Sequence, residues 1–105
     1  MIELSVRRFA EKRDARENVV LLDVREPYEV AAASLPDATL IPMMEIPARY
    51  AELPRDKAIV VMCHHGVRSE SVAAFLEANG YTDVANLTGG IAAWSNEIDP
   101  SVPHY

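Results

Sequence analysis

Two short apolar runs constrain the fold of this sequence more than any other feature. They are VVLLD at 19–23 and AIVVM at 58–62, and both have the length and β-branched content of strands buried on both faces. Helical patterns lie between and after them, so strands and helices alternate along the chain. In a chain this short, that order predicts an α/β fold: a small, open, mostly parallel sheet with helices on both faces.

The first helices are expected at 6–15 after a capping Ser5, at 27–33 with a proline in its first turn, and at 69–79 with Ser69 as its cap. The spacing of apolar residues makes the last of these the strongest helical pattern in the chain.

A further strand is expected at 84–87, and a short helix carrying Trp94 follows the glycine pair 89–90. We expect Trp94 to be a core aromatic. The segment around 42–54 contains three prolines and is expected to be less regular. With no internal repeat and no linker, we interpret residues 1–105 as one domain.

Composition excludes several classes of partner. The net charge of −6 repels phosphate backbones, so we expect no binding to nucleic acid. The apolar runs are far shorter than the roughly 20 residues that span a bilayer, and the start of the chain lacks a signal-peptide pattern. We therefore predict a cytoplasmic protein that does not enter a membrane.

Cys63 is the only cysteine, which rules out an internal disulfide and any CxxC metal site. It directly follows the run 58–62, and open α/β sheets hold their ligands beyond the carboxyl ends of the strands. We therefore interpret Cys63 as a working thiol at the mouth of a loop rather than as core filling.

From the thiol onward the sequence reads CHHGVRS, a strand-to-helix turn with a glycine inside it. Successive N–H groups in such a turn converge on one point, and the helix start adds about half a positive charge, so the pKa of Cys63 should fall. Gly66 suits a backbone with positive φ, and the planar fork of Arg68 suits an oxyanion such as thiosulfate.

Two histidines follow the thiol. His64 and His65 are adjacent and have no nearby carboxylate or second cysteine, so we predict neither a metal site nor a cofactor. Two roles stay open for them: solvent-facing side chains that tune local charge, or direct contacts to substrate.

The loop CHHGVRS resembles the active-site loop of the rhodanese family. LLDVREPYEV at 21–30 resembles the family's DVRE segment, and 87–105 resembles its GG-x-x-AW segment and tail. The resemblance implies a sheet of about five strands and a sulfurtransferase that carries sulfane sulfur as a cysteine persulfide. Thiosulfate is the expected donor and cyanide or a dithiol the expected acceptor, with a transient protein donor or acceptor as a further partner.

Carried over residue by residue, the resemblance makes Cys63 the nucleophile and sulfur carrier. Arg68 would hold the charge of the donor or brace the loop, and Asp23 and Arg25 would support the site through salt bridges. The segment 33–38 departs from the family's G-H-I-P-G-A stretch, which we treat as structural variation. The substrate-binding loop is expected to comprise His64, His65, Gly66, Val67, Arg68 and Ser69.

Two other functions compete with sulfur transfer. Phosphatases and arsenate reductases also use a cysteine loop with a following arginine, but with five residues between the two, whereas only four intervene here. A non-catalytic docking module is the other alternative, and the intact Cys63 and Arg68 argue against it. We assign no function to the tail after Trp94.

Overall fold

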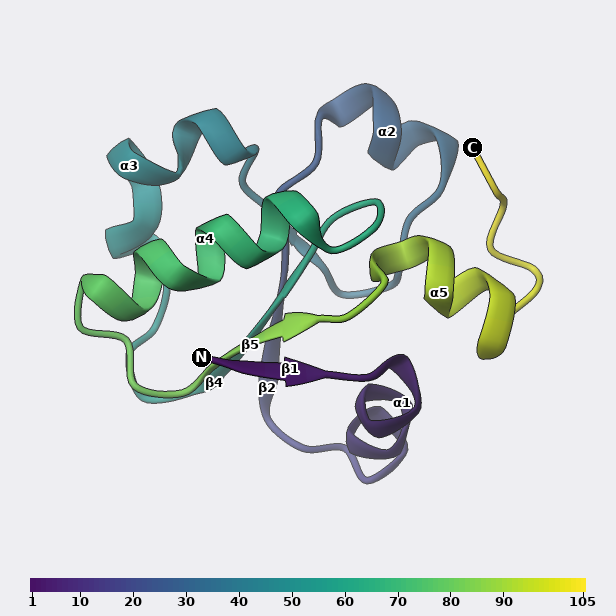
Figure 1. Ribbon diagram of the computed structural model, residues 1–105, viewed down its shortest axis with the longest axis horizontal. Coiled ribbons are helices and arrows are strands. Elements are labelled where there is room, and N and C mark those ends of the chain that lie inside the picture. The colour runs from purple at the N-terminus through teal and green to yellow at the C-terminus, as the bar shows by residue number, and fades with distance from the viewer.

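The computed structural model describes residues 1–105, and its centre is a five-stranded sheet in which all pairings are parallel (Figure 1). The two apolar runs form β2 (Val19–Asp23) and β4 (Ala58–Met62), which pair with each other. The expected strand at 84–87 is β5 (Val84–Leu87), on the other side of β4. The predicted α/β class with a parallel sheet is confirmed.

Two edge strands complete the order β1-β5-β4-β2-β3. β1 (Ile2–Leu4) pairs with β5, and β3 (Thr39–Leu40) pairs with β2. At three and two residues, they are too short for an alternating pattern to reveal them. The number of strands implied by the resemblance is therefore right, although residue patterns did not locate these two.

The first two helices are α1 (Val6–Asp14) and α2 (Pro27–Ala32), each ending one residue before its predicted end. Ser5 caps α1 as predicted, because its hydroxyl oxygen accepts a hydrogen bond from the N–H of Arg8 at 3.1 Å. The proline-containing middle of the chain consists of short helical turns: η1 (Met43–Glu45), α3 (Ile46–Arg49) and η2 (Tyr50–Glu52).

The strongest predicted helix begins earlier than its sequence suggests. α4 (Val67–Ala78) has Gly66 as its N-cap, with φ of 99°, so the prediction that Ser69 caps this helix is wrong. The left-handed backbone at Gly66 turns the chain into the helix two residues sooner, which leaves the buried Ser69 inside the first turn. The last helix, α5 (Gly90–Glu97), carries Trp94 as expected.

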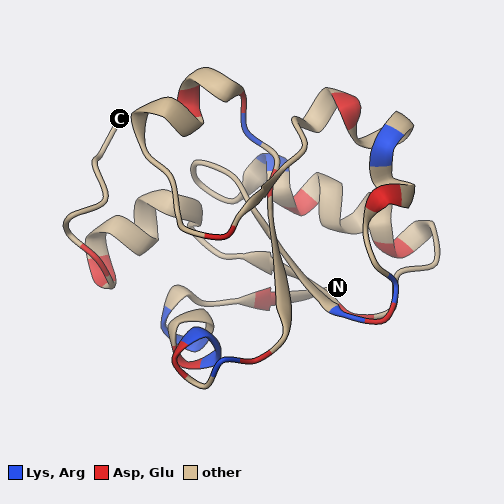
Figure 2. Ribbon diagram, turned by 180° about the vertical axis from the view of Figure 1, so that it is seen from behind, with Lys and Arg blue, Asp and Glu red and all other residues tan.

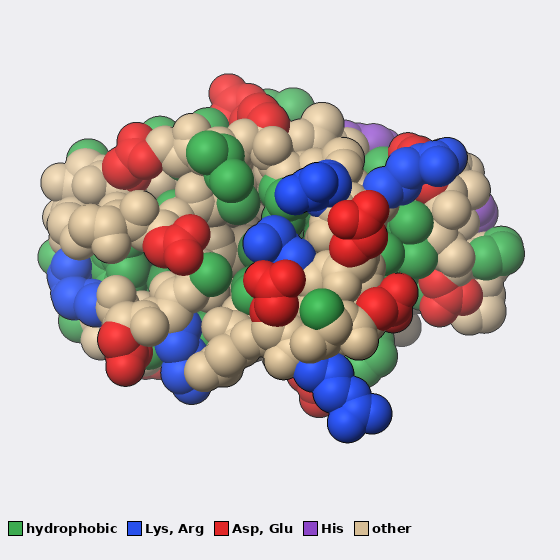
Figure 3. Space-filling view, turned by 90° about the horizontal axis from the view of Figure 1, so that it is seen from below, with side chains coloured by type: hydrophobic (Ala, Val, Ile, Leu, Met, Phe, Trp, Pro, Cys, Tyr) green, Lys and Arg blue, Asp and Glu red, His purple; other side chains and the backbone are tan.

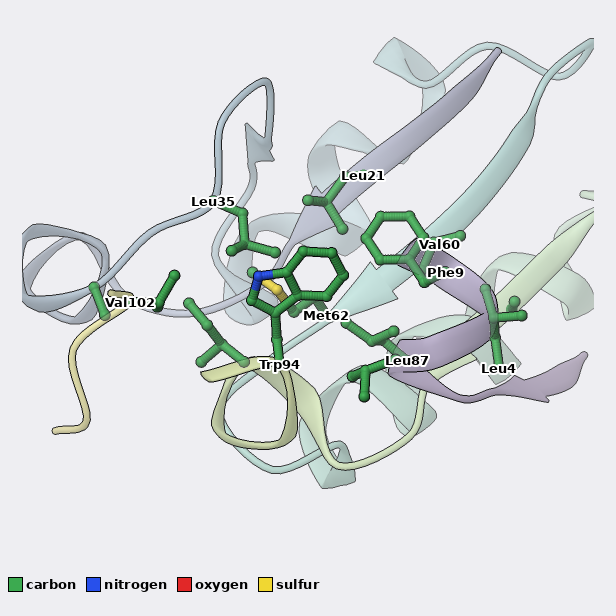
Figure 4. Close-up of a cluster of buried hydrophobic side chains, with 13 residues drawn as sticks. Leu4, Phe9, Leu21, Leu35, Val60, Met62, Leu87, Trp94 and Val102 are labelled. Carbon is green, nitrogen blue, oxygen red and sulfur yellow. The ribbon is translucent and has the colours of Figure 1, made fainter. Parts of the chain in front are cut away.

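Side chains of the central strands alternate between two hydrophobic clusters, one on each face of the sheet. Leu21 lies in the cluster covered by α1 and α5, whereas Leu22 lies in the cluster covered by α3 and α4. In the first cluster Trp94 packs edge-on against Phe9 with ring centroids 5.6 Å apart (Figure 4). Helices on both faces and a core role for Trp94 are thus confirmed.

Charged side chains lie mainly on the helices and loops around the sheet (Figure 2). On the face shown in Figure 3, acidic and basic side chains are interspersed rather than gathered into one field. None of the helices is both long and apolar enough to cross a membrane.

Candidate active site

Cys63 lies immediately after the central strand β4, at the carboxyl edge of the sheet. The loop that it opens joins β4 to α4 (Figure 1), so the thiol lies where open parallel sheets hold ligands. It is deeper than the sequence suggests, because the residue is only 1% exposed. Cys63 belongs to the hydrophobic cluster that α3 and α4 cover, so its side chain is buried rather than open at the mouth of the loop.

Two donors of the loop are directed at the sulfur. The N–H of Gly66 lies 3.0 Å from Sγ, and the hydroxyl of Ser69 lies 3.3 Å from it. Burial raises the pKa of Cys63, but hydrogen bonds from Ser69, Gly66 and His65 outweigh it, so this pKa is below the ordinary value for a thiol. The loop therefore favours the thiolate, which is the nucleophilic form.

Ser69 connects the sulfur to β5. Its oxygen also lies 2.5 Å from Oδ1 of Asn86, whose amide in turn donates to the carbonyl of Gly66 at 3.1 Å. A hydroxyl has one proton, so Ser69 donates either to the Asn86 oxygen or to the sulfur. This geometry lets Ser69 accept from a neutral thiol and donate to the thiolate.

Gly66 and Gly90 allow two segments to approach closely. A Cβ added at Gly66 would lie 3.1 Å from the N of Gly89, and one at Gly90 would lie 2.5 Å from the carbonyl oxygens of Cys63 and His64. The space is used by hydrogen bonds from α5: Ile91 N donates to Cys63 O at 3.0 Å and Ala92 N to His64 O at 3.1 Å. The carbonyl groups of Cys63 and His64 are therefore hydrogen-bonded to α5, whereas the N–H group of Gly66 faces the sulfur.

Arg68 is already paired. Its guanidinium donates to both carboxylate oxygens of Glu29, at 2.7 and 2.9 Å. Hydrogen bonds from Arg68, acting against a smaller effect of burial, lower the pKa of Glu29 to about 2. Of the two roles left open for Arg68, this geometry favours bracing of the loop. Glu29 was not predicted as a site residue, although it lies within the DVREPYEV segment.

Asp23 and Arg25 form a second ion pair, at 2.8 Å, and both side chains are almost completely buried. The guanidinium also donates to the carbonyl of Ala33 at 2.8 Å and to the hydroxyl of Tyr105 at 2.8 Å. The pair joins the end of β2 to the turn after α2.

The tail returns to the loop, where the sequence had indicated no role for it. The ring of Tyr105 stacks on His64 with centroids 3.9 Å apart, and His64 stacks on His65 at the same distance. The Tyr105 hydroxyl donates to Glu29 at 2.8 Å. Burial is the largest cause that lowers the pKa of His64, and the neighbouring His65 lowers it further. Val67, in contrast, exposes its side chain and contributes only its backbone to the turn.

The fold and the loop together define an α/β protein with one cysteine held among main-chain and hydroxyl donors. The chain belongs to the rhodanese-like domain family, whose model matches residues 5–97. It is 44% identical over 86 residues to a protein named Sulfurtransferase from Allochromatium vinosum, covering 82% of this chain and 80% of that one. It is 36% identical to Thiosulfate sulfurtransferase GlpE from Pseudomonas syringae over 78 residues, 74% of each chain.

A solved structure supports the same assignment. The crystal structure of a rhodanese-like domain protein from Staphylococcus aureus matches with a TM-score of 0.86 and 32% identity, covering 100% of this chain and 99% of that one. The family resemblance drawn from the three motifs is thereby confirmed.

Proposed function

We propose that the protein is a sulfurtransferase that moves sulfane sulfur from an anionic donor such as thiosulfate to a thiophilic acceptor through a persulfide on Cys63. The observation that carries the proposal is the pair of donors on Sγ, the Gly66 N–H at 3.0 Å and the Ser69 hydroxyl at 3.3 Å. Both stabilise negative charge on sulfur, which is needed before attack and again in the persulfide.

In the first half-reaction the Cys63 thiolate attacks the outer sulfur of thiosulfate. A new S–S bond forms to Cys63, the S–S bond of the donor breaks, and sulfite leaves with the electron pair of that bond. The outer sulfur remains on the protein as an anionic persulfide. Charge is conserved, since a thiolate and a doubly charged donor give a persulfide anion and a doubly charged sulfite.

In the second half-reaction an acceptor attacks the outer sulfur of the persulfide. Cyanide forms a C–S bond and leaves as thiocyanate, whereas a thiolate leaves as a new persulfide. In both cases the S–S bond to Cys63 breaks and its electron pair returns to Cys63 as the thiolate. The cycle needs neither a cofactor nor an external oxidant.

The loop residues have separate roles in this proposal. The backbone N–H groups of His65, Gly66 and Ser69 would stabilise charge on the sulfur, to which the Ser69 hydroxyl also responds. Arg68 holds the start of α4 to α2 through Glu29. Asp23 and Arg25 would hold the end of β2 to the turn after α2. We further propose that a protein sulfur donor or acceptor is the physiological partner, as relatives include a protein named as a probable adenylyltransferase/sulfurtransferase from Mycobacterium tuberculosis.

Phosphate-ester hydrolysis is the competing chemistry. Only four residues separate Cys63 from Arg68, and both terminal nitrogens of the Arg68 guanidinium donate to Glu29. Both features favour a single added sulfur over a phosphoryl group that needs contacts to all its oxygens.

The experiment is a thiosulfate-to-cyanide assay of the wild-type protein beside Cys63→Ser, with an aryl phosphate tested in parallel. We expect thiocyanate from the wild type alone and negligible phosphate release, because a serine hydroxyl is not ionised at neutral pH. Phosphate release as fast as thiocyanate formation would reverse the assignment.

A further inference from the structure

Tyr105 joins two ion pairs, Asp23–Arg25 and Glu29–Arg68, into one network. Its hydroxyl oxygen accepts a hydrogen bond from Nη1 of Arg25 at 2.8 Å, and its proton is donated to Oε2 of Glu29, also at 2.8 Å. A guanidinium can only donate and an ionised carboxylate can only accept, so the direction of both hydrogen bonds is fixed. A continuous run of hydrogen bonds thus connects the end of β2 with the first turn of α4.

The tail that carries Tyr105 is anchored at further points. Val102 is buried in the hydrophobic cluster covered by α1 and α5, and its carbonyl oxygen accepts a hydrogen bond from the Ser95 hydroxyl at 2.5 Å. The end of the tail lies beside α2 (Figure 1), and the Tyr105 ring stacks on His64 with the ring planes inclined by 10°. These contacts hold the Tyr105 hydroxyl in the network, even though 40% of the residue is exposed.

Glu29 is a buried carboxylate whose position depends on its donors. Oε1 accepts from Nη1 of Arg68 at 2.7 Å and from the N–H of Glu26 at 3.1 Å. Oε2 accepts from Nη2 of Arg68 at 2.9 Å and from the Tyr105 hydroxyl. A buried charge is stable only while its hydrogen bonds are made, and without Tyr105 the Oε2 atom is held by Arg68 alone.

Arg68 lies in the turn that supplies the donors to the sulfur. The N–H of Gly66 and the hydroxyl of Ser69, on either side of Arg68 in the chain, lie 3.0 and 3.3 Å from Sγ. Hydrogen bonds to Glu29 are the largest cause that raises the pKa of Arg68, and the charge of Cys63 raises it further. A shift of the Arg68 side chain would therefore change both the charge near the sulfur and the turn that places its donors.

We propose that Tyr105 is a positioning residue of the sulfur-transfer site. Its hydroxyl fixes the Glu29 carboxylate, which fixes Arg68 and, through Arg68, the turn of donors at the Cys63 sulfur. The inference rests on the proposed sulfurtransferase function and adds a residue of the tail to it. In this role Tyr105 acts on the reaction through Glu29 and Arg68 rather than by contact with the substrate.

The kinetic test is Tyr105→Phe, which removes the hydroxyl and keeps the ring. In the thiosulfate-to-cyanide assay we expect kcat to fall about fivefold and the KM for thiosulfate to change less than about twofold, because a hydrogen bond to a charged group is lost away from the substrate. Tyr28→Phe is the matched control, since Tyr28 precedes Glu29 in α2 and is 74% exposed; it should change neither constant. Equal kinetics for the two variants would overturn the proposal.

Dependence on Arg68 is tested by adding Tyr105→Phe to Arg68→Lys. A lysine cannot form the bidentate pair with Glu29, so the contact through which Tyr105 acts is already lost. We expect the kcat of the double variant to stay within about 1.5-fold of that of Arg68→Lys, because residues that act through one contact are not additive. A further fall of about fivefold, as expected for independent effects, would show that Tyr105 does not act through Arg68.

The Nη–H signals of the Arg68 guanidinium report on positioning without sulfur chemistry. They are recorded by NMR on Cys63→Ser and assigned by their loss when Arg68→Lys is added. Two hydrogen bonds to Glu29 restrain rotation of the guanidinium, so we expect resolved signals in Cys63→Ser, with or without Tyr28→Phe. Adding Tyr105→Phe should broaden them. Unchanged signals with Tyr105→Phe, or no resolved signals in Cys63→Ser itself, would contradict the proposal.

A failure of the positioning role can be distinguished from a failure of sulfur transfer. If the wild type forms no thiocyanate, sulfur transfer is wrong, whereas the NMR signals still report whether Tyr105 fixes Arg68. If thiocyanate forms but Tyr105→Phe matches Tyr28→Phe in kcat and in the NMR signals, the positioning role is wrong and sulfur transfer stands.

Discussion

Arg68 donates from Nη1 to Oε1 of Glu29 at 2.7 Å and from Nη2 to Oε2 at 2.9 Å, and so ties the first turn of α4 to α2. The two residues are 39 positions apart in the chain. This bidentate pair fixes the direction of the helix whose start lies behind the Cys63 sulfur.

The pair predicts how Arg68 variants behave. Arg68→Ala and Arg68→Lys should both lower kcat for thiosulfate by roughly tenfold, because a lysine cannot replace a bidentate guanidinium, while the KM for thiosulfate changes less than about twofold. Steady-state kinetics check this, with Arg49→Ala, in an exposed pair away from the loop, as the control. A large rise in KM at constant kcat would mean that Arg68 holds the donor.

Glu29 should make stability depend on pH. Its pKa is about 2 in the folded protein against an ordinary value of 4.5, so its contribution is fully present above about pH 4.5 and is lost as the pH falls through about 2. We expect about 2 kcal/mol from this source, since partial exposure of Arg68 weakens the interaction. Urea unfolding of the wild type and Glu29→Gln across this range should show their difference in free energy of unfolding shrink at low pH. Glu70→Gln, on the exposed side of α4, should show no such change.

Ser69 should control the acidity of the thiol. Ser69→Ala removes a donor 3.3 Å from Sγ, and loss of a hydrogen bond that stabilises the thiolate should raise the pKa of Cys63. The midpoint of the pH profile for alkylation by iodoacetamide measures this pKa. Ser71→Ala, with an exposed serine in the same helix, should leave the midpoint in place. An unchanged midpoint in Ser69→Ala would mean that the Ser69 hydroxyl does not stabilise the thiolate.

Substitution of Gly90 by alanine should be far more destabilising than the same substitution of Gly80, which also has a positive φ. An alanine Cβ at Gly90 would lie 2.5 Å from two loop carbonyl oxygens, whereas at Gly80 it would meet only the flexible end of Arg55 at 2.9 Å. We expect Gly90→Ala to cost about 3 kcal/mol or more and to abolish turnover, and Gly80→Ala to cost about 1 kcal/mol with turnover intact. Denaturant unfolding and turnover measured together check both. Equal, mild effects would contradict the tight contact between α5 and the loop.

The local parts of the site could be predicted from sequence, because they lie in one continuous segment. Cys63, Gly66 and Arg68 stand between a strand pattern and a helix pattern, so their position at the sheet edge follows from the order of the chain. The positive φ expected for Gly66 is present, at 99°. The start of α4 was misplaced because Ser69 has the residue type of a cap but serves as a buried partner of Sγ.

The partners from distant segments could not be predicted in this way. Tyr105 meets Glu29 across 76 positions, and Asn86 meets the carbonyl of Gly66 across 20. No local sequence pattern predicts either contact, because the contacts form only when the tail and β5 pack against the rest of the fold. Asp37 shows a related limit, since it adopts a positive φ of 64° that no local sequence pattern predicted.

The most direct test is intact-mass measurement of the protein after exposure to thiosulfate and removal of the donor. We expect the wild-type chain to gain one sulfur atom, cyanide to remove it as an equal amount of thiocyanate, and Cys63→Ser to gain none. A wild-type chain without added sulfur, or the same gain in Cys63→Ser, would contradict a persulfide on this residue.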